Sequence, residues 1–222
     1  MSWSRAMLLG RNGFGNDSFV KLLVQPGTSI VDTAAGAAPH TLTAHNSAAV
    51  VTDAAFPSGS AVSLGANGYV DTPSSEDWHL RDMDFTIDCF VRPSPTYADF
   101  GFLGTTGQFL IGRQTSNNWK VWLNSTGADG AWSLGIFDTG LVVSWGNVQH
   151  VALVRSGSSF LFFVDGATAN ILTSSASLKV DNSPLMSGNT YIPFTNSYFS
   201  GLRISKGVAR WTRPFTVPSR AY

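Results

Sequence analysis

The chain has 222 residues, no net charge at pH 7 and a charged fraction of 13%, about half the usual share. With a pI near 6.9 the chain as a whole is not a binder of polyanions, which argues against nucleic acid as a partner. No apolar run approaches the ~18 residues of a membrane span, and the apolar stretch 7–9 is too short for a signal peptide. The one cysteine allows no intrachain disulfide, so we expect assembly in a reducing cytoplasm without insertion into a membrane.

Residues 1–16 are predicted to form an irregular N-terminal arm, because glycine and asparagine interrupt any regular period in this stretch. The arm nevertheless carries apolar side chains, which need a partner surface on this fold or on another subunit. We therefore expect the arm to anchor or assemble the protein through Trp3, Leu8, Leu9 and Phe14.

From residue 17 onwards, short β-rich runs alternate with glycine and proline, and no stretch keeps the 3.6-residue period of a helix. The only helical turn expected lies near residues 74–78, where Ser74 is placed to cap it. Short strands at roughly 8–12 residue spacing predict a β-sandwich or barrel. The expected strands are 19–24, 61–64, 68–71, 85–91, 102–103, 109–111, 119–123, 132–137, 150–155, 160–164, 168–172 and 199–204.

The dipeptide Asp165-Gly166 is the strongest turn signal in the chain. It separates two β-rich runs, and both central positions of a two-residue hairpin turn of this type need positive φ, which glycine and aspartate tolerate. The sequence therefore predicts a tight hairpin between 160–164 and 168–172.

Charge is distributed unevenly along the chain. Residues 71–99 contain seven acidic and two basic residues, whereas five basic and no acidic residues follow Asp181. One interpretation is that these regions pair within the fold or across a subunit contact. The other is that a basic tail carrying Arg210 and Arg213 docks on an acidic neighbour, so these two arginines are assembly candidates.

Three sequence blocks carry a family resemblance. They are GYVDTP (68–73) with DFTID (84–88), HVALVR (150–155) with FVDG (163–166), and GLRISKGVARW (201–211) followed by Phe215 and Pro218. In this order they resemble the concanavalin A-like, laminin-G-type jelly rolls common in bacterial and bacteriophage proteins. Two positions depart from the usual pattern, because Asp88 replaces glutamate and Phe90 stands where tryptophan is common. The resemblance extends over residues 17–222, and its last block is similar to versions encoded in phage tail and virion genes.

The resemblance implies an all-β, two-sheet antiparallel jelly-roll sandwich over residues 17–222. Within it, Arg203 is expected to pair with an acid inside the sheet contact, and Trp211 and Phe215 to pin the C-terminal segment onto the sandwich. It further implies a non-catalytic component of a phage virion, such as a fibre, tail or capsid-decorating protein. The expected partners are other virion proteins, further copies of the chain and a glycan of the host surface.

Catalysis is not expected. Retaining glucanases on this fold use a pair of carboxylates about 5–5.5 Å apart, drawn from two glutamates and an aspartate on one strand. This chain has a single glutamate, Glu76, so a hydrolase would have to rely on Asp84 and Asp88 and stays a remote alternative. The histidines lack metal-binding spacing, and no nucleophile or phosphate-loop motif is present. A second alternative is a stand-alone carbohydrate-binding module of a bacterial surface protein.

Sugar binding is the function that the middle of the chain favours. Aromatic faces suit the apolar side of a sugar ring, and amide or carboxylate groups suit its hydroxyls. Trp119 and Trp122 fall on opposite faces of one strand, so at most one of them is exposed, and a core role for these tryptophans stays open. The candidates are Trp119, Trp122, Trp132, Asn118, Asn124 and Asp129.

Calcium is a possible cofactor through the resemblance, because laminin-G-type domains often hold one calcium ion at the rim of the sandwich with aspartate and backbone oxygens. The sequence contains no dense acidic loop. The rim candidates are Asp71, Asp99 and Asp138, beside Asp129, which is already a sugar-binding candidate.

Overall fold

The structure is a computed structural model that describes residues 15–95, 99–188, 196–217, 219 and 222. Within these residues the chain forms two antiparallel β-sheets and a single 3-10 turn, η1 (Glu76–Trp78). None of the described helical residues forms a segment long and apolar enough to cross a membrane. The expected arm residues Trp3, Leu8, Leu9 and Phe14 lie outside the described part of the chain.

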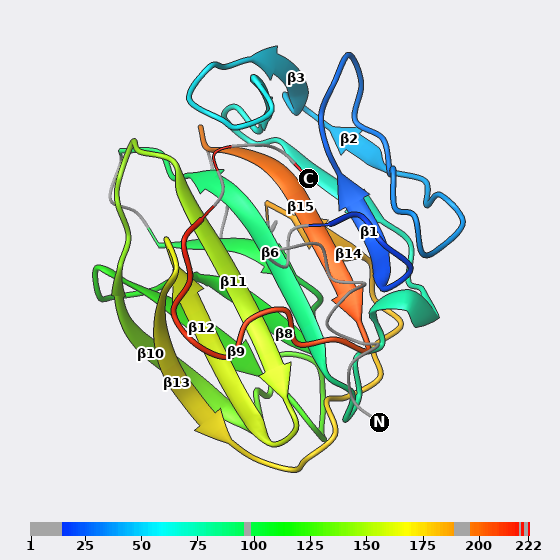
Figure 1. The fold of residues 1–222 in the computed structure, drawn as a ribbon, viewed down its shortest axis with the longest axis vertical. Coiled ribbons are helices and arrows are strands. Elements are labelled where there is room, and N and C mark those ends of the chain that lie inside the picture. Colours follow the sequence, from blue (N-terminus) through cyan, green and yellow to red (C-terminus); the bar gives the residue numbers. More distant parts are fainter. Residues whose placement is uncertain (1–14, 96–98, 189–195, 218, 220–221) are drawn as a thin grey trace.

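The first sheet has eight strands among the described residues. Its central strand β15 pairs with β6 on one side and with β4 and β1 on the other (Figure 1). In spatial order the sheet contains β13 (Ala167–Thr173), β12 (Ser159–Val164), β11 (Gln149–Ser156), β6 (Phe85–Arg92), β15 (Tyr198–Lys206), β4 (Ser60–Ser63) and β3 (Ala49–Thr52), with β1 (Val20–Val24) also paired to β15.

The second sheet has seven strands in the described chain and packs against the first. Its edge strand β10 pairs with β9, which contains three of the six residues considered for sugar binding, and the other three lie in the connection between the two strands. In spatial order the sheet contains β10 (Gly135–Val142), β9 (Asn118–Leu123), β8 (Phe109–Arg113), β7 (Phe100–Gly104), β14 (Leu185–Ser187), β5 (Tyr69–Thr72) and β2 (Thr43–His45). The all-β, two-sheet sandwich expected from the sequence is confirmed.

The core lies between the two sheets and follows the alternation of the strands. In β6, Phe85, Ile87, Cys89 and Val91 point into it and are at most 1% exposed. Burying apolar side chains of this size stabilises the fold by roughly 1.5–3 kcal/mol each. The thiol of Cys89 is buried and free, and burial raises its pKa well above the usual value.

The predicted hairpin is confirmed. Strands β12 and β13 are joined by Asp165 and Gly166, whose φ angles of 50° and 80° are both positive. Glycine is required at the second position for a further reason, because a Cβ on Gly166 would lie 1.8 Å from the carbonyl oxygen of Phe215. The turn therefore serves as a contact point for the C-terminal segment.

The C-terminal segment covers the outer side of the eight-stranded sheet. In Figure 1 it runs in red across β11 and β12. The rings of Trp211 and Phe215 stack with their centroids 4.3 Å apart and pack with Ala152, Val154 and Phe163. The expected role of these two aromatic residues in holding the C-terminal segment is confirmed.

Some elements differ from the sequence-based expectation. The 3-10 turn is capped by Ser75, whose hydroxyl accepts a hydrogen bond from the Asp77 amide, whereas the Ser74 hydroxyl lies 3.3 Å from the carbonyl oxygen of Asp181. Ser74 is therefore not the cap. The strands β2, β3 and β14 were not expected, because runs of three or four residues without strong apolar alternation give little signal.

Candidate functional site

The six residues considered for sugar binding do not form one site, because they lie at both ends of β9. Asn118 begins this strand and Asn124 follows its last residue. At ~3.3 Å per residue, roughly 20 Å separate the two positions. Asn124, Asp129 and Trp132 share the connection between β9 and β10, whereas Asn118 belongs to the opposite end of the sandwich.

Trp119 and Trp122 are both buried within β9, at 0% and 3% exposure. Trp119 belongs to the core between the sheets, and its indole N–H donates to Gln149 Oε1 at 3.3 Å. Trp122 points to the other face of the strand, as the alternation of a strand requires. Neither ring presents a face to solvent on which a sugar could stack.

Asn124 is a structural residue of the β9–β10 connection. Its amide group donates to the carbonyl oxygens of Gly107 and Ala128, and its Oδ1 accepts from the backbone N–H and the hydroxyl of Ser133. Both donors and both acceptor positions of the side chain are occupied by these bonds. The residue fixes the loop rather than offering free groups to a ligand.

A polar rim surrounds this fixed loop. We call it the Asp129 rim and define it as Thr106, Gly107, residues 124–134 and residues 179–183. Asp129 forms an ion pair with Lys179, and its carboxylate lies so close to Gly107 that a Cβ there would be 2.5 Å from it. The hydroxyls of Thr106 and Ser183 are hydrogen-bonded at 2.6 Å. Segments that lie 50 and 77 positions apart in the sequence therefore meet at one end of the sandwich.

Asp181 holds the rim segment 179–183 against Gly107. Its carboxylate accepts hydrogen bonds from the amides of Gly107 at 2.8 Å and Ser183 at 2.9 Å. Burial opposes ionisation, but the hydrogen bonds from Thr105, Ser183 and Gly107 outweigh it and lower the pKa of Asp181. The carboxylate is thus held as an anion that fixes the loop geometry.

The exposed groups of the rim suit a polar ligand with an apolar face. The Asp129 side chain is 51% exposed, and Trp132 is partly exposed with a positive φ of 46°. Hydroxyls, a carboxylate and an ammonium group thus belong to the same rim as one partly exposed tryptophan, and these are the kinds of group found in many sugar sites. Sequence reasoning missed Lys179, Asp181, Ser183 and Thr106, because no local pattern links them to Asp129.

The aspartates considered for calcium are separated and bonded to other groups. Asp71 pairs with His45 at 3.1 Å and Asp99 with Arg113 at 2.6 Å, while Asp138 accepts from the Asn118 amide at 2.8 Å. Within the described residues, no three His, Cys, Asp or Glu side chains lie close enough together to hold a metal ion. These three aspartates therefore do not fit a shared calcium site.

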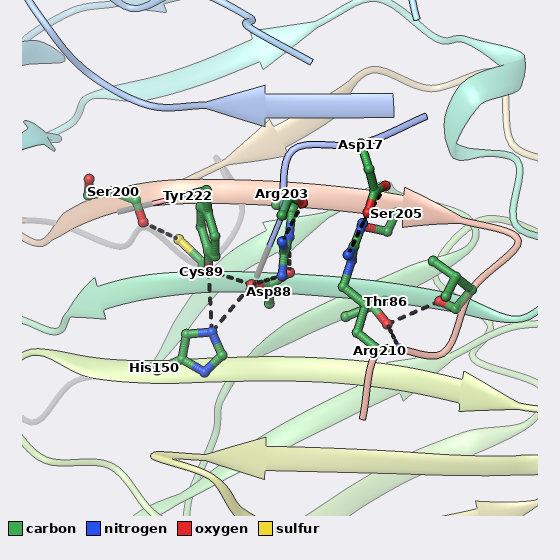
Figure 2. Close-up of polar contacts among 12 residues, drawn as sticks. Asp17, Thr86, Asp88, Cys89, His150, Ser200, Arg203, Ser205, Arg210 and Tyr222 are labelled. Atoms are coloured by element: carbon green, nitrogen blue, oxygen red, sulfur yellow. Dashed lines mark hydrogen bonds and ion pairs between the residues drawn. The ribbon is translucent and has the colours of Figure 1, made fainter. Parts of the chain in front are cut away.

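A buried charged cluster lies on the outer side of the eight-stranded sheet (Figure 2). Asp88 of β6 accepts from Arg203 of β15 through two hydrogen bonds, Nε to Oδ1 at 2.9 Å and Nη2 to Oδ2 at 3.0 Å. His150 of β11 lies 3.3 Å from Oδ2, and all three side chains are fully buried. The expectation that Arg203 pairs with a buried acid is confirmed, and Asp88 is that acid, but the pair lies on the outer side of the sheet and not in the contact between the two sheets.

This cluster also bears on the remote hydrolase alternative. The Asp88 side chain has no exposed surface that a substrate could contact. Asp84, one residue before β6, accepts a hydrogen bond from the Gly157 amide at 2.7 Å. Both carboxylates serve as structural acceptors. The described residues thus give this aspartate pair no acid–base geometry.

The two basic assembly candidates differ in their surroundings. Arg210 is 8% exposed, and its guanidinium donates to Asp17 at 2.9 and 3.1 Å and to the Ser205 hydroxyl at 2.8 Å. The ion pair between Arg210 and Asp17 therefore holds the C-terminal segment against residue 17 of the same chain. Arg213 is exposed.

Stability is expected to fall at low pH because of Asp88. Burial raises the pKa of this carboxyl, but the charge of Arg203 and the hydrogen bond from His150 outweigh burial and lower the pKa from 3.8 to about 2. Because the pKa of Asp88 is lower in the folded protein than in the unfolded chain, its ionised carboxylate stabilises the fold by about 2 kcal/mol above pH ~4. This stabilisation is lost as the pH falls from 4 to 2. Urea unfolding between pH 5 and 2 measures it, and Asp88→Asn is expected to flatten this part of the profile. A profile unchanged in Asp88→Asn would contradict the assignment.

Comparison with solved structures shows the same architecture. The binding domain of Paraclostridial Mosquitocidal Protein 1 matches with a TM-score of 0.69 and 13% identity, over 88% of this chain and 51% of that one. Domain 4 of AbnA, an extracellular arabinanase from Geobacillus stearothermophilus, solved with arabinotriose, matches with a TM-score of 0.64 and 16% identity, over 86% and 93%. The binding domain of Botulinum Neurotoxin DC with SialylT matches with a TM-score of 0.65 and 14% identity, over 88% and 50%.

At these identities the likeness shows the fold alone, and the chain spans about half the length of the two toxin binding domains. No curated protein matches the sequence. The family model of the concanavalin A-like lectin/glucanases superfamily, of the laminin-G type, matches residues 64–217, which include β5 to β15. The chain belongs to the concanavalin A-like lectin/glucanase superfamily.

Proposed function

We propose that this chain is a non-catalytic carbohydrate-binding domain that holds a glycan at the Asp129 rim. Solved structures of the same fold include a domain of an arabinanase in complex with arabinotriose and a toxin binding domain in complex with SialylT, which supports a glycan as ligand. The observation that carries the proposal is the rim itself, where the half-exposed Asp129 and the partly exposed Trp132 stand on a loop fixed by Asn124 and Asp181.

A rigid polar rim favours binding because little conformational entropy is lost when the ligand arrives. The side-chain bonds of Asn124 and Asp181 hold the backbone of the loop before any ligand is present. The ion pair between Asp129 and Lys179 offers both an acceptor and donors to sugar hydroxyls. The rim therefore contains the groups that sugar recognition needs.

The binding proposal is tested on a glycan array followed by calorimetry with arabinotriose and sialylated oligosaccharides. Trp132→Ala is expected to weaken binding roughly five- to thirtyfold, because the loss of an aromatic stacking surface is worth on the order of 1–2 kcal/mol. The matched control is Trp145→Ala, which removes a partly exposed tryptophan near the opposite end of β9, where its indole N–H donates to Asn117. Equal losses in both variants, or no glycan bound by the wild type, would contradict the proposal.

We further propose that the domain belongs to a bacteriophage virion, as part of a fibre, tail or capsid decoration, with other virion proteins and further copies of itself as partners. The resemblance of residues 201–215 to phage virion sequences motivates this placement. Mass spectrometry of purified particles is expected to detect the chain. A stand-alone carbohydrate-binding module of a bacterial surface protein is the alternative, and it would show glycan binding while the chain is absent from every band of the particle.

A further inference from the structure

Strand β15 departs from regular pairing beside the buried charged cluster. Its register with β6 shifts between Ser200 and Arg203, and Gly201, inside this bulge, has a positive φ of 63°. A Cβ on Gly201 would lie 2.6 Å from Cε2 of Tyr222. The bulge and its glycine thus make room for the ring of a residue 21 positions further along the chain.

The ring of Tyr222 fills this space. The guanidinium carbon of Arg203 lies 4.2 Å from the centre of the Tyr222 ring, and the Phe90 ring lies 6.1 Å away at a tilt of 40°. An arginine over an aromatic face is an attractive contact, and it strengthens when water is excluded. The walls of the pocket are therefore a planar cation, an aromatic ring and a glycine backbone.

The end of this pocket is polar. The Tyr222 hydroxyl donates to Asp88 Oδ2 and lies 3.3 Å from His150 Nε2 (Figure 2). Burial and the Asp88 carboxylate raise the pKa of the Tyr222 phenol well above its usual value, so the hydroxyl keeps the proton that it donates. A neutral O–H donor fits this end, whereas a phenolate would face the Asp88 anion.

We propose that the outer side of the eight-stranded sheet carries a binding pocket for neutral phenols, and that Tyr222 occupies this pocket in cis. The ligand class follows from the lining. The flat walls select an aromatic ring, and the ionised acceptor at the end selects a hydroxyl on it. The acceptor exists independently of Tyr222, because Arg203 holds Asp88 ionised through two hydrogen bonds. The pocket is separate from the Asp129 rim and does not depend on glycan binding.

The test removes the Tyr222 ring from the pocket by substitution and measures the binding of free phenol. Tyr222→Ala is expected to bind phenol, with a melting temperature that rises progressively with phenol concentration and saturates. Calorimetry is expected to show phenol binding at least tenfold tighter than toluene, which has the ring but no hydroxyl. The wild type and Tyr222→Phe, whose pockets stay filled, are expected to show no saturable response to either compound.

The outcomes separate clearly. No saturable phenol response in folded Tyr222→Ala, or an equal response in the wild type, would overturn the proposal. If Tyr222→Ala does not fold alone, it is refolded with phenol or with toluene and followed by circular dichroism. Recovery that depends on phenol supports the pocket, and recovery with neither or equally with both overturns it. Tyr222→Leu, which fills part of the ring volume, is expected to fold and to bind phenol more weakly than Tyr222→Ala.

Discussion

Replacing Arg203 with alanine is expected to lower the free energy of unfolding by about 3–5 kcal/mol, since it leaves the Asp88 carboxylate buried without its cation. The Arg203 guanidinium also donates to the carbonyl oxygen of Gly15 at 3.0 Å and stacks on Tyr222, so both terminal segments lose a contact. For a domain of this length the melting temperature is expected to fall by roughly 6–20 °C. Urea unfolding and calorimetry at pH 7 measure the two quantities.

Two further variants show whether the loss comes from the unpaired charge. Arg213→Ala removes an exposed arginine of the same segment and is expected to change stability by less than about 0.5 kcal/mol. The double variant Asp88→Leu with Arg203→Met replaces the pair with apolar side chains, which is often close to neutral, and is expected to recover at least half of the loss. An Arg203→Ala protein as stable as the wild type would show that the pair is not buried as described.

The sequence predicts best where the signal is local. The turn at Asp165 and Gly166 can be predicted from two adjacent residues. The strand β6 can be predicted from the alternation of side chains over seven consecutive residues, 85–91. The pairing of Arg203 with an acid was expected from the resemblance, but its partner Asp88 lies 115 positions away, and only the sheet order brings β6 beside β15. A local sequence pattern does not determine which residues of two strands so far apart in the chain are paired.

The Asp129 rim shows the opposite case. Asp129 was visible as an acid in a loop, but its companions Lys179 and Asp181 come from a segment without regular structure. Composition also could not separate the tryptophans, because burial depends on what covers each face of a strand, and Trp119 and Trp122 lie on opposite faces of β9 yet are both buried. Trp119 faces the core, whereas Trp132 follows the strand on a left-handed turn. The two residues have the same chemistry and different degrees of burial.

This difference in burial, together with the proposed glycan site, predicts opposite effects of two similar substitutions. Trp119→Ala is expected to lower the free energy of unfolding by about 3–5 kcal/mol, because it opens a large cavity between the sheets. The Trp119 ring contacts Phe100 and Phe162 edge-on or tilted, with centroids 5.5 and 6.3 Å away, and its N–H bond to Gln149 would also be lost. Trp132→Ala is expected to cost less than about 1 kcal/mol, since its ring is partly exposed.

Urea unfolding of the two variants, run beside glycan binding of each, separates scaffold from site. Trp119→Ala is expected to lose stability and, while folded, to keep its affinity, because the bonds of Asn124 that hold the Asp129 rim do not involve Trp119. Trp132→Ala is expected to keep stability and lose affinity. The reverse pattern would place the ligand on β9 rather than on the loop that follows it, since a tryptophan that binds sugar must expose a ring face and a core tryptophan cannot.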